Sequence, residues 1–155
     1  MKIKFEPATI NDAELLINIR NLCFYGDFIK YGECPAYNNT LESMTNTILN
    51  RIVYKIIHNN QIIGNISIRD NLDSTYYLGC LCVIADYENK GIGQEALKFI
   101  ETKYPNATAW TLESPADKER NHYFYKKAGY TIVKEYMNNS VKVVLFEKKM
   151  NVVEL

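Results

Sequence analysis

The stretch Glu88-Asn-Lys-Gly-Ile-Gly-Gln-Glu-Ala-Leu-Lys-Phe-Ile100 places two glycines, one residue apart, ahead of a helical pattern. Ile92, Ala96, Phe99 and Ile100 fall on one face of that helix. Glycines at such a turn let the backbone come close to a ligand, and the free N–H groups of a helix start attract anions. We therefore expect an anionic ligand at this turn.

The composition limits what the protein can be. The chain has 155 residues, 47% of them hydrophobic, which is enough for one core and too little for two ordinary domains, so a single domain over residues 1–155 is expected. Lys plus Arg and Asp plus Glu both number 18, so no global positive field favours nucleic acid. No signal-peptide pattern and no apolar run of about 18 residues occurs. We expect a cytoplasmic protein that binds neither nucleic acid nor membrane.

Cysteines and histidines are the candidates for disulfides and metal ligands. Cys80 and Cys82 lie two residues apart in an apolar run, where neither is placed to bridge the other, so reduced core cysteines are favoured over disulfides. His58 and His122 stand alone, without the paired spacings of a zinc site. No metal is expected.

A helix and an irregular segment are predicted near the N-terminus. Asn11 and Glu14 have the spacing of a capping box, and the apolar face that follows runs to Cys23. Residues 25–39 contain two glycines and a proline and are expected to be irregular.

Strand and helix patterns alternate along the rest of the chain. Strands are expected at residues 3–5, 53–57, 61–68, 76–83, 107–112, 130–137 and 141–147, and helices at residues 11–23, 40–49, 92–100 and 119–128. The run 76–83 is apolar on both faces, which is typical of a strand in the middle of a sheet. This order predicts an α/β (α+β) fold.

Two common nucleotide motifs explain the glycine turn poorly. A triphosphate-binding loop needs Gly-Lys-Ser/Thr at its end, whereas Gly93 is followed by Gln94. Residues 91–96 do fit the Gly-x-Gly-x-x-Ala pattern of dinucleotide-binding folds, with Glu113 twenty residues after the second glycine. However, residues 85–90 intervene between the end of the strand and the first glycine, and the chain has one strand-helix-strand unit only.

Two motifs together resemble the GNAT superfamily of N-acetyltransferases. They are Val83-Ile-Ala-Asp-Tyr-Glu-Asn-Lys-Gly-Ile-Gly93 and Asn121-His-Tyr-Phe-Tyr-Lys-Lys-Ala-Gly-Tyr130. The family has a pyrophosphate loop, Gln/Arg-x-x-Gly-x-Gly/Ala, and a later Phe/Leu-Tyr-x-Lys-x-Gly-Phe/Tyr signature. The resemblance covers essentially the whole chain. It implies one GNAT-like domain with a mixed, mostly antiparallel sheet of six to seven strands flanked by about four helices.

The chain departs from the family pattern at two positions. Glu88 stands where the loop has Gln or Arg, and its side chain is expected to face solvent while Lys90 and Gln94 supply donors nearby. Lys118 stands where the family often has Asn, and Asn121 is the candidate replacement for its cofactor contacts.

The resemblance implies acetyl-CoA as cosubstrate. Its pyrophosphate would lie on the backbone N–H groups at the start of the helix, and its pantetheine arm would pair beside the fourth strand. The implied cofactor-binding residues are Leu81, Cys82, Val83, Asn89, Lys90, Gly91, Ile92, Gly93, Gln94 and Asn121.

The resemblance also implies two catalytic residues. Tyr125 matches the general acid that protonates the departing thiolate, and Glu113 has the spacing at which some members place a general base acting through water. For Glu113, a strand-end acid that caps a loop remains an equal alternative. Because Cys80 and Cys82 lack a histidine close in sequence, direct transfer in a ternary complex is favoured over an acetyl-cysteine route.

The segment between the first two helices forms one wall of the acceptor pocket in this family. Here residues 25–37 alternate aromatics with Asp27 and Glu33, which suits a cationic amine on a small molecule or a protein. The alternative is an ordinary surface loop. A homodimer is left open, and the rival function is a CoA-binding module that senses or scaffolds without turnover.

Overall fold

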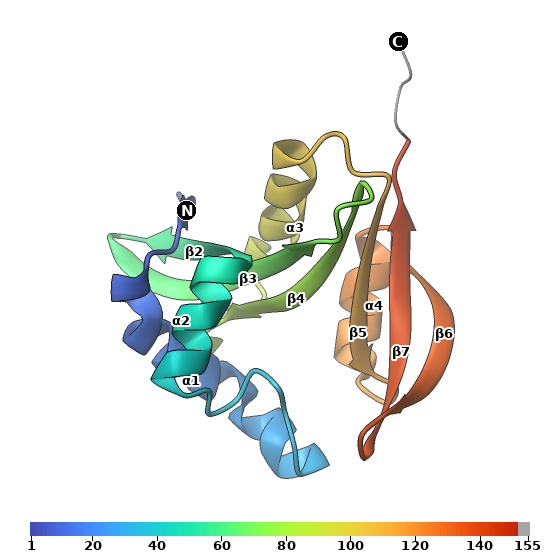
Figure 1. Ribbon diagram of the computed structural model, residues 1–155, viewed down its shortest axis with the longest axis horizontal. Helices are drawn as coiled ribbons and strands as arrows, with labels where there is room; N and C mark the ends of the chain where they lie inside the picture. The colour runs from blue at the N-terminus through green and yellow to red at the C-terminus, as the bar shows by residue number, and fades with distance from the viewer. Residues whose placement is uncertain (152–155) are drawn as a thin grey trace.

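The computed structural model describes residues 1–151 and contains one seven-stranded sheet of order β1-β2-β3-β4-β5-β7-β6 (Figure 1). The strands are β1 (Lys4–Pro7), β2 (Ile52–His58), β3 (Gln61–Asp70), β4 (Thr75–Val83), β5 (Ala109–Pro115), β6 (Thr131–Asn138) and β7 (Val141–Lys149). All neighbouring strands are antiparallel except β4 and β5. The prediction of a mixed, mostly antiparallel sheet with a central strand at 76–83 is confirmed.

Helices cover both faces of the sheet. The helices are α1 (Ala13–Tyr31), α2 (Leu41–Asn50), α3 (Ile92–Lys103) and α4 (Glu119–Lys127), with short 3-10 turns η1 (Ile10–Asp12) and η2 (Ala85–Tyr87). One face packs against α1 and α2, and the other packs against α3 and α4 (Figure 1). Among residues 1–151, no helix is both long and apolar enough to cross a membrane.

Helix α1 is longer than predicted. It continues through Gly26 to Tyr31 and ends at Gly32, which adopts a left-handed conformation with φ 77°. A glycine inside a helix costs about 1 kcal/mol relative to alanine, which the packing of a long amphipathic helix can offset. The expectation of an irregular segment from residue 25 is therefore wrong up to residue 31.

The start of α1 also differs from the prediction. Asn11 lies inside η1, and the polar contact at this end is made by Asp12, whose Oδ2 accepts a hydrogen bond of 2.8 Å from the backbone N–H of Thr9. The helix then begins at Ala13, so Asn11 and Glu14 do not form the predicted capping box.

The sheet opens between its two central strands. Residues 75–77 of β4 pair with residues 109–111 of β5, and the pairing ends there although β4 continues to Val83 and β5 to Pro115. A bulge at Gly79 adds one residue to β4 opposite β3, which bends the strand. Beyond the shared residues one edge of β4 is left without a partner strand, as the diverging arrows of β4 and β5 show (Figure 1).

One core joins the two halves of the sheet at the point where β4 and β5 pair. Trp110 of β5 is completely buried and stacks on Tyr76 of β4 with the ring centroids 4.8 Å apart. The same cluster contains Ile66 from β3 and Phe146 from β7. Only a few backbone hydrogen bonds join β4 to β5, so packed side chains hold the two halves of the sheet together.

Candidate active site

The glycine turn forms the start of α3. Gly91 adopts a left-handed conformation with φ 80°, and a Cβ there would meet nothing within 4 Å, so the backbone angle is the reason for glycine. The N–H of Glu95 donates to the carbonyl oxygen of Gly91 at 3.0 Å. The N–H groups of Ile92, Gly93 and Gln94 precede this bond in the first turn, where they are available to an anion.

Gly93 is a glycine for a different reason. A Cβ on it would lie 2.8 and 2.9 Å from two ring carbons of Phe124, so the ring on α4 would have to move if residue 93 carried a side chain. Gln94 reinforces this contact because its Nε2 donates to the carbonyl oxygen of Phe124 at 3.1 Å. The side chain of Gln94 is thus partly engaged with α4.

Glu88 is paired with a cation. Its Oε2 accepts from Nη2 of Arg120 at 2.9 Å, and the Glu88 side chain is 37% exposed. The side chain is partly exposed to solvent, as expected, and the donor paired with it is Arg120 instead of Lys90 or Gln94. Arg120, at the start of α4, offsets the negative charge of Glu88 beside the glycine turn. The two residues are 32 positions apart, so no local pattern indicated their pairing.

Tyr125 is a buried residue of α4. Its ring packs against Tyr130 and Phe146, and the residue is 8% exposed. Burial raises the pKa of Tyr125 well above its ordinary value, and the neighbouring Cys80 and Tyr77 raise it further. The ring contacts Phe146 of β7, and Tyr77 and Cys80 of β4 are close enough to act on the phenol, so Tyr125 lies beside strands of both halves of the sheet. This phenol is a proton donor at neutral pH.

Glu113 lies on β5 with its side chain on the face of α1 and α2. Its Oε1 accepts from the hydroxyl of Tyr77 at 3.2 Å and from Nδ2 of Asn138 at 3.4 Å. Burial, together with the charge of Glu113, raises the pKa of Tyr77 to about 12 and that of Tyr136 to about 12. These phenols therefore stay protonated and surround the carboxylate with donors.

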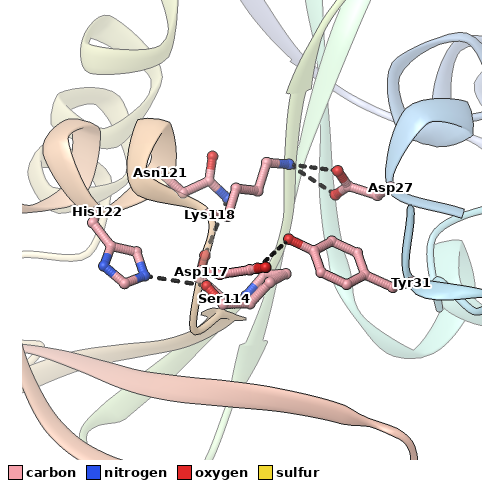
Figure 2. A network of polar contacts seen from close by, with 8 residues as sticks. Asp27, Tyr31, Ser114, Asp117, Lys118, Asn121 and His122 are labelled. Carbon is pink, nitrogen blue, oxygen red and sulfur yellow. Dashed lines mark hydrogen bonds and ion pairs between the residues drawn. The ribbon is translucent and has the colours of Figure 1, made fainter. Parts of the chain in front are cut away.

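Asn121 is directed toward the end of β5. Its Nδ2 donates to Oγ of the buried Ser114 at 3.2 Å, and Nε2 of His122 next to it donates to the carbonyl oxygen of Pro115 at 3.1 Å (Figure 2). These contacts hold the start of α4 against β5. A cofactor contact of Asn121 stays a prediction.

A buried cation on α1 was missed by sequence reasoning. Arg20 is 5% exposed, and its Nε and Nη2 donate to Oδ1 of Asn65 at 3.3 and 3.0 Å. Nδ2 of Asn65 donates to Sγ of Cys82 at 3.0 Å. One signal was available, because Arg20 lies four residues after the buried Leu16 on the apolar face of its helix.

This cation acts on Cys80. The pKa of Cys80 is lowered to about 7, because a hydrogen bond from Cys82, the charge of Arg20 and a hydrogen bond from Asn65 together outweigh burial, which raises it. Hydrogen bonding with Cys23 and Cys80 raises the pKa of Cys82. All four cysteines are free thiols, as predicted, and Cys80 is the one favoured as a thiolate.

The two acids predicted to bind the acceptor are engaged within the protein. Both carboxylate oxygens of Asp27 accept from Nζ of Lys118, at 2.7 and 3.0 Å (Figure 2). Oε2 of Glu33 accepts from Oγ of Ser140 at 2.9 Å. Little free negative charge is left at Asp27, and an acceptor contact by either acid stays a prediction.

The aromatics of the same segment lie apart from these acids. Tyr37 stacks on Phe28 with the ring centroids 4.7 Å apart and lies 6.0 Å from the ring of Tyr25. Tyr25 and Phe28 occupy one face of α1, whereas Asp27 contacts the start of α4 from another. The structure does not bring aromatic faces and carboxylates together into one cage.

The opened sheet, the glycine turn and the buried tyrosine define an acyltransferase-like architecture, and comparison with known proteins agrees. Residues 50–132, more than half of the chain, match the family model described as the acetyltransferase (GNAT) domain. The chain belongs to the GNAT acetyltransferase family.

Similar proteins carry the same fold. The PaiA N-acetyltransferase of Thermoplasma acidophilum, solved in complex with coenzyme A, superposes with a TM-score of 0.82 at 19% identity, covering 97% of this chain and 100% of that one. The ribosomal-protein-S18-alanine N-acetyltransferase of Escherichia coli gives 0.80 at 12% identity, covering 99% and 97%. The uncharacterized protein YrkN of Bacillus subtilis is 31% identical over 113 residues, 68% of this chain, and the chain spans 60% of YrkN.

Proposed function

We propose that the protein transfers the acetyl group of acetyl-CoA to a primary amine by direct attack in a ternary complex. The observation that carries this proposal is the position of Tyr125. It is a buried phenol with a raised pKa that packs on Phe146 of β7 and lies near Cys80 and Tyr77 of β4, the strand from which β5 diverges. A group held in this way can protonate a departing thiolate without first losing its own proton to water.

Two backbone surfaces support binding of acetyl-CoA beside Tyr125. The N–H groups of Ile92, Gly93 and Gln94 suit a pyrophosphate at the start of α3. The edge of β4 at Leu81 and Val83 has no partner strand on the side of β5, so a peptide-like pantetheine arm can pair there. The cosubstrate supplies an activated thioester between these two surfaces.

Glu113 supports the proton transfer from the amine. An amine must be neutral to attack a thioester, and a carboxylate on the α1 and α2 side of the gap can accept its proton through water. Tyr77 and Asn138 fix the carboxylate by donating to Oε1. Glu113 would thus act on the amine and Tyr125 on the thiolate, from opposite faces of the sheet.

The test is release of free thiol from acetyl-CoA in the presence of a mixed panel of amines, with calorimetry for cofactor binding. Tyr125→Phe keeps the ring and its packing, so turnover should fall by about 10²–10⁴-fold while CoA affinity is retained. A fully active Tyr125→Phe enzyme would refute the role. CoA binding by the wild type without thiol release on any amine would instead indicate a module that senses or scaffolds.

A further inference from the structure

A set of polar contacts spans the opening of the sheet on the side of α1. These contacts connect the last turns of α1 and the residues just after it to the β5–α4 loop and the β6–β7 turn. We call this set the polar bridge; it consists of Asp27, Tyr31 and Glu33 on one side and Asp117, Lys118 and Ser140 on the other.

The centre of the polar bridge is a shielded ion pair. Lys118 and Asp27 are 27% and 21% exposed, and Nζ of Lys118 contacts both carboxylate oxygens of Asp27 (Figure 2). The hydroxyl of Tyr31 donates to Oδ1 of Asp117 at 2.6 Å (Figure 2). Charges held with this little solvent around them interact more strongly than a fully exposed pair does.

The second end of the polar bridge is at the tip of the β6–β7 hairpin. Oγ of Ser140 donates to Oε2 of Glu33 at 2.9 Å. The contact from Glu33 and the contacts from α1 therefore reach two separate segments of the C-terminal half of the sheet. The gap between α1 and this half is closed by direct hydrogen bonds at both places.

The polar bridge lies on the side from which an acceptor would enter. The start of α3, where the cofactor would be held, belongs to the opposite face of the sheet from α1. Glu113 and Tyr77 face α1, so an amine that Glu113 serves would approach from this side. Asn138, which donates to Glu113, lies two residues from Ser140 on the same hairpin, so the polar bridge borders that approach.

We propose that the polar bridge restricts the acceptor to a small free amine and excludes an amine carried on a folded protein or an extended peptide. This inference rests on the proposed function and names its substrate class. An extended peptide that pairs with a strand lies about 4.8 Å from it, backbone to backbone. Its side chains need about 10 Å in the direction perpendicular to the sheet. The polar bridge joins its two sides through contacts of 2.6 to 3.0 Å, so a chain cannot run between them unless they break.

The fold alone does not set the size of the acceptor. The Escherichia coli neighbour of TM-score 0.80 is named for an alanine of a ribosomal protein, so the same architecture is compatible with a protein acceptor. The restriction therefore has to come from side chains of this chain that span the opening, and the polar bridge is the set that does so.

The experiment compares two acceptors with the same reacting amine. One is the amide of a single amino acid that releases thiol in the panel, and the other is a longer peptide beginning with the same residue. The amide should have the higher kcat/KM by about tenfold or more, the range that steric discrimination in a pocket reaches. Asp27→Asn combined with Tyr31→Phe removes two contacts of the polar bridge and should lower this ratio by about tenfold.

Two further variants complete the design. Ser140→Ala opens only the hairpin end, and it keeps the test valid if the double variant does not fold. Glu135→Gln removes an exposed pair with Lys142 on the same hairpin, 2.8 Å long, and should leave the ratio unchanged. A wild type that uses the peptide as well as the amide, or an unchanged ratio in both bridge variants, would overturn the inference. CoA binding without thiol release on any amine would overturn the proposed function, and this inference with it.

Discussion

Arg20 is a charged residue placed inside the core. Among residues 1–151 no carboxylate forms an ion pair with it, and its guanidinium hydrogen-bonds to the neutral side chain of Asn65. A buried cation is costly unless an anion offsets it. Cys80 supplies that anion when its thiol ionises, and this explains why the charge of Arg20 lowers the pKa of Cys80.

Alkylation of Cys80 should therefore show an unusual pH dependence. The thiolate is the reactive form, so the rate with iodoacetamide should rise through pH 7 in the wild type, instead of through the ordinary value of 9.0. Arg20→Met removes the cation and should move the midpoint to higher pH, whereas Arg20→Lys should move it less. Peptide mass mapping of Cys80 over a pH series measures this. Identical midpoints in wild type and Arg20→Met would show that the cation does not act on Cys80.

Glu113→Gln tests the proposed general base through its pH profile. The variant keeps the acceptor atom for Tyr77 and loses the ability to take a proton. Its kcat/KM should be lowered by about 10²-fold or more near neutral pH, and it should approach the wild-type rate once the pH exceeds the pKa of the amine itself, because the amine then arrives neutral. If kcat/KM of the variant and of the wild type change with pH in parallel, Glu113 has only a structural role.

Sequence reasoning located the glycine turn and the Tyr125 helix because each is a contiguous motif. The roles of their residues stay predictions, and the environment of Tyr125 depends on Cys80 and Tyr77 of β4. The polar bridge is different: its pairs lie 86, 91 and 107 positions apart, so only the folded chain brings them together. The environment of Cys80 was missed for the same reason, because Arg20 comes from another element.

At the scale of elements, every predicted strand and helix is present. The largest errors are at the ends of α1, and β5 runs from Ala109 to Pro115 where residues 107–112 were predicted. Gly26 and the aromatics after Cys23 look like a loop when read locally. In the structure this part of α1 makes tertiary contacts, because Phe28 packs on Tyr37 and Asp27 pairs with Lys118, and such contacts can stabilise a helix against its local propensity. A local sequence pattern reports the helix propensity of its residues. It does not contain the tertiary contacts that can override this propensity.

The contact between α3 and α4 gives a prediction at this scale. Gly93→Ala forces a methyl group against the Phe124 ring, so α3 should shift relative to α4. CoA affinity should fall, and stability should fall by about 1–3 kcal/mol, as is usual for overpacking. Adding Phe124→Leu should restore part of both, which calorimetry and urea unfolding measure. If the second substitution restores neither, the ring is not what excludes a side chain at residue 93.

At the scale of the molecule, the shared core should make the two halves unfold together. Trp110, the one tryptophan of the chain, lies where β4 and β5 pair. Its fluorescence should follow the loosening of this junction, and far-UV circular dichroism should follow the whole fold. We expect the two signals to give coincident urea transitions, because Trp110 packs in a cluster built from both halves. A fluorescence transition at lower urea would mean that the junction opens first.

The unpaired edge of β4 also affects the tendency of the protein to aggregate. An open row of N–H and C=O groups is a template for another strand, and exposed strand edges are a common origin of aggregation. Here β5 diverges from this edge and α1 packs on the neighbouring Cys80 and Cys82, so a slender guest should reach the row more easily than a second sheet can. A cosubstrate paired there would satisfy those backbone groups, and purified protein should therefore resist heat-induced precipitation better with the cosubstrate present than without it.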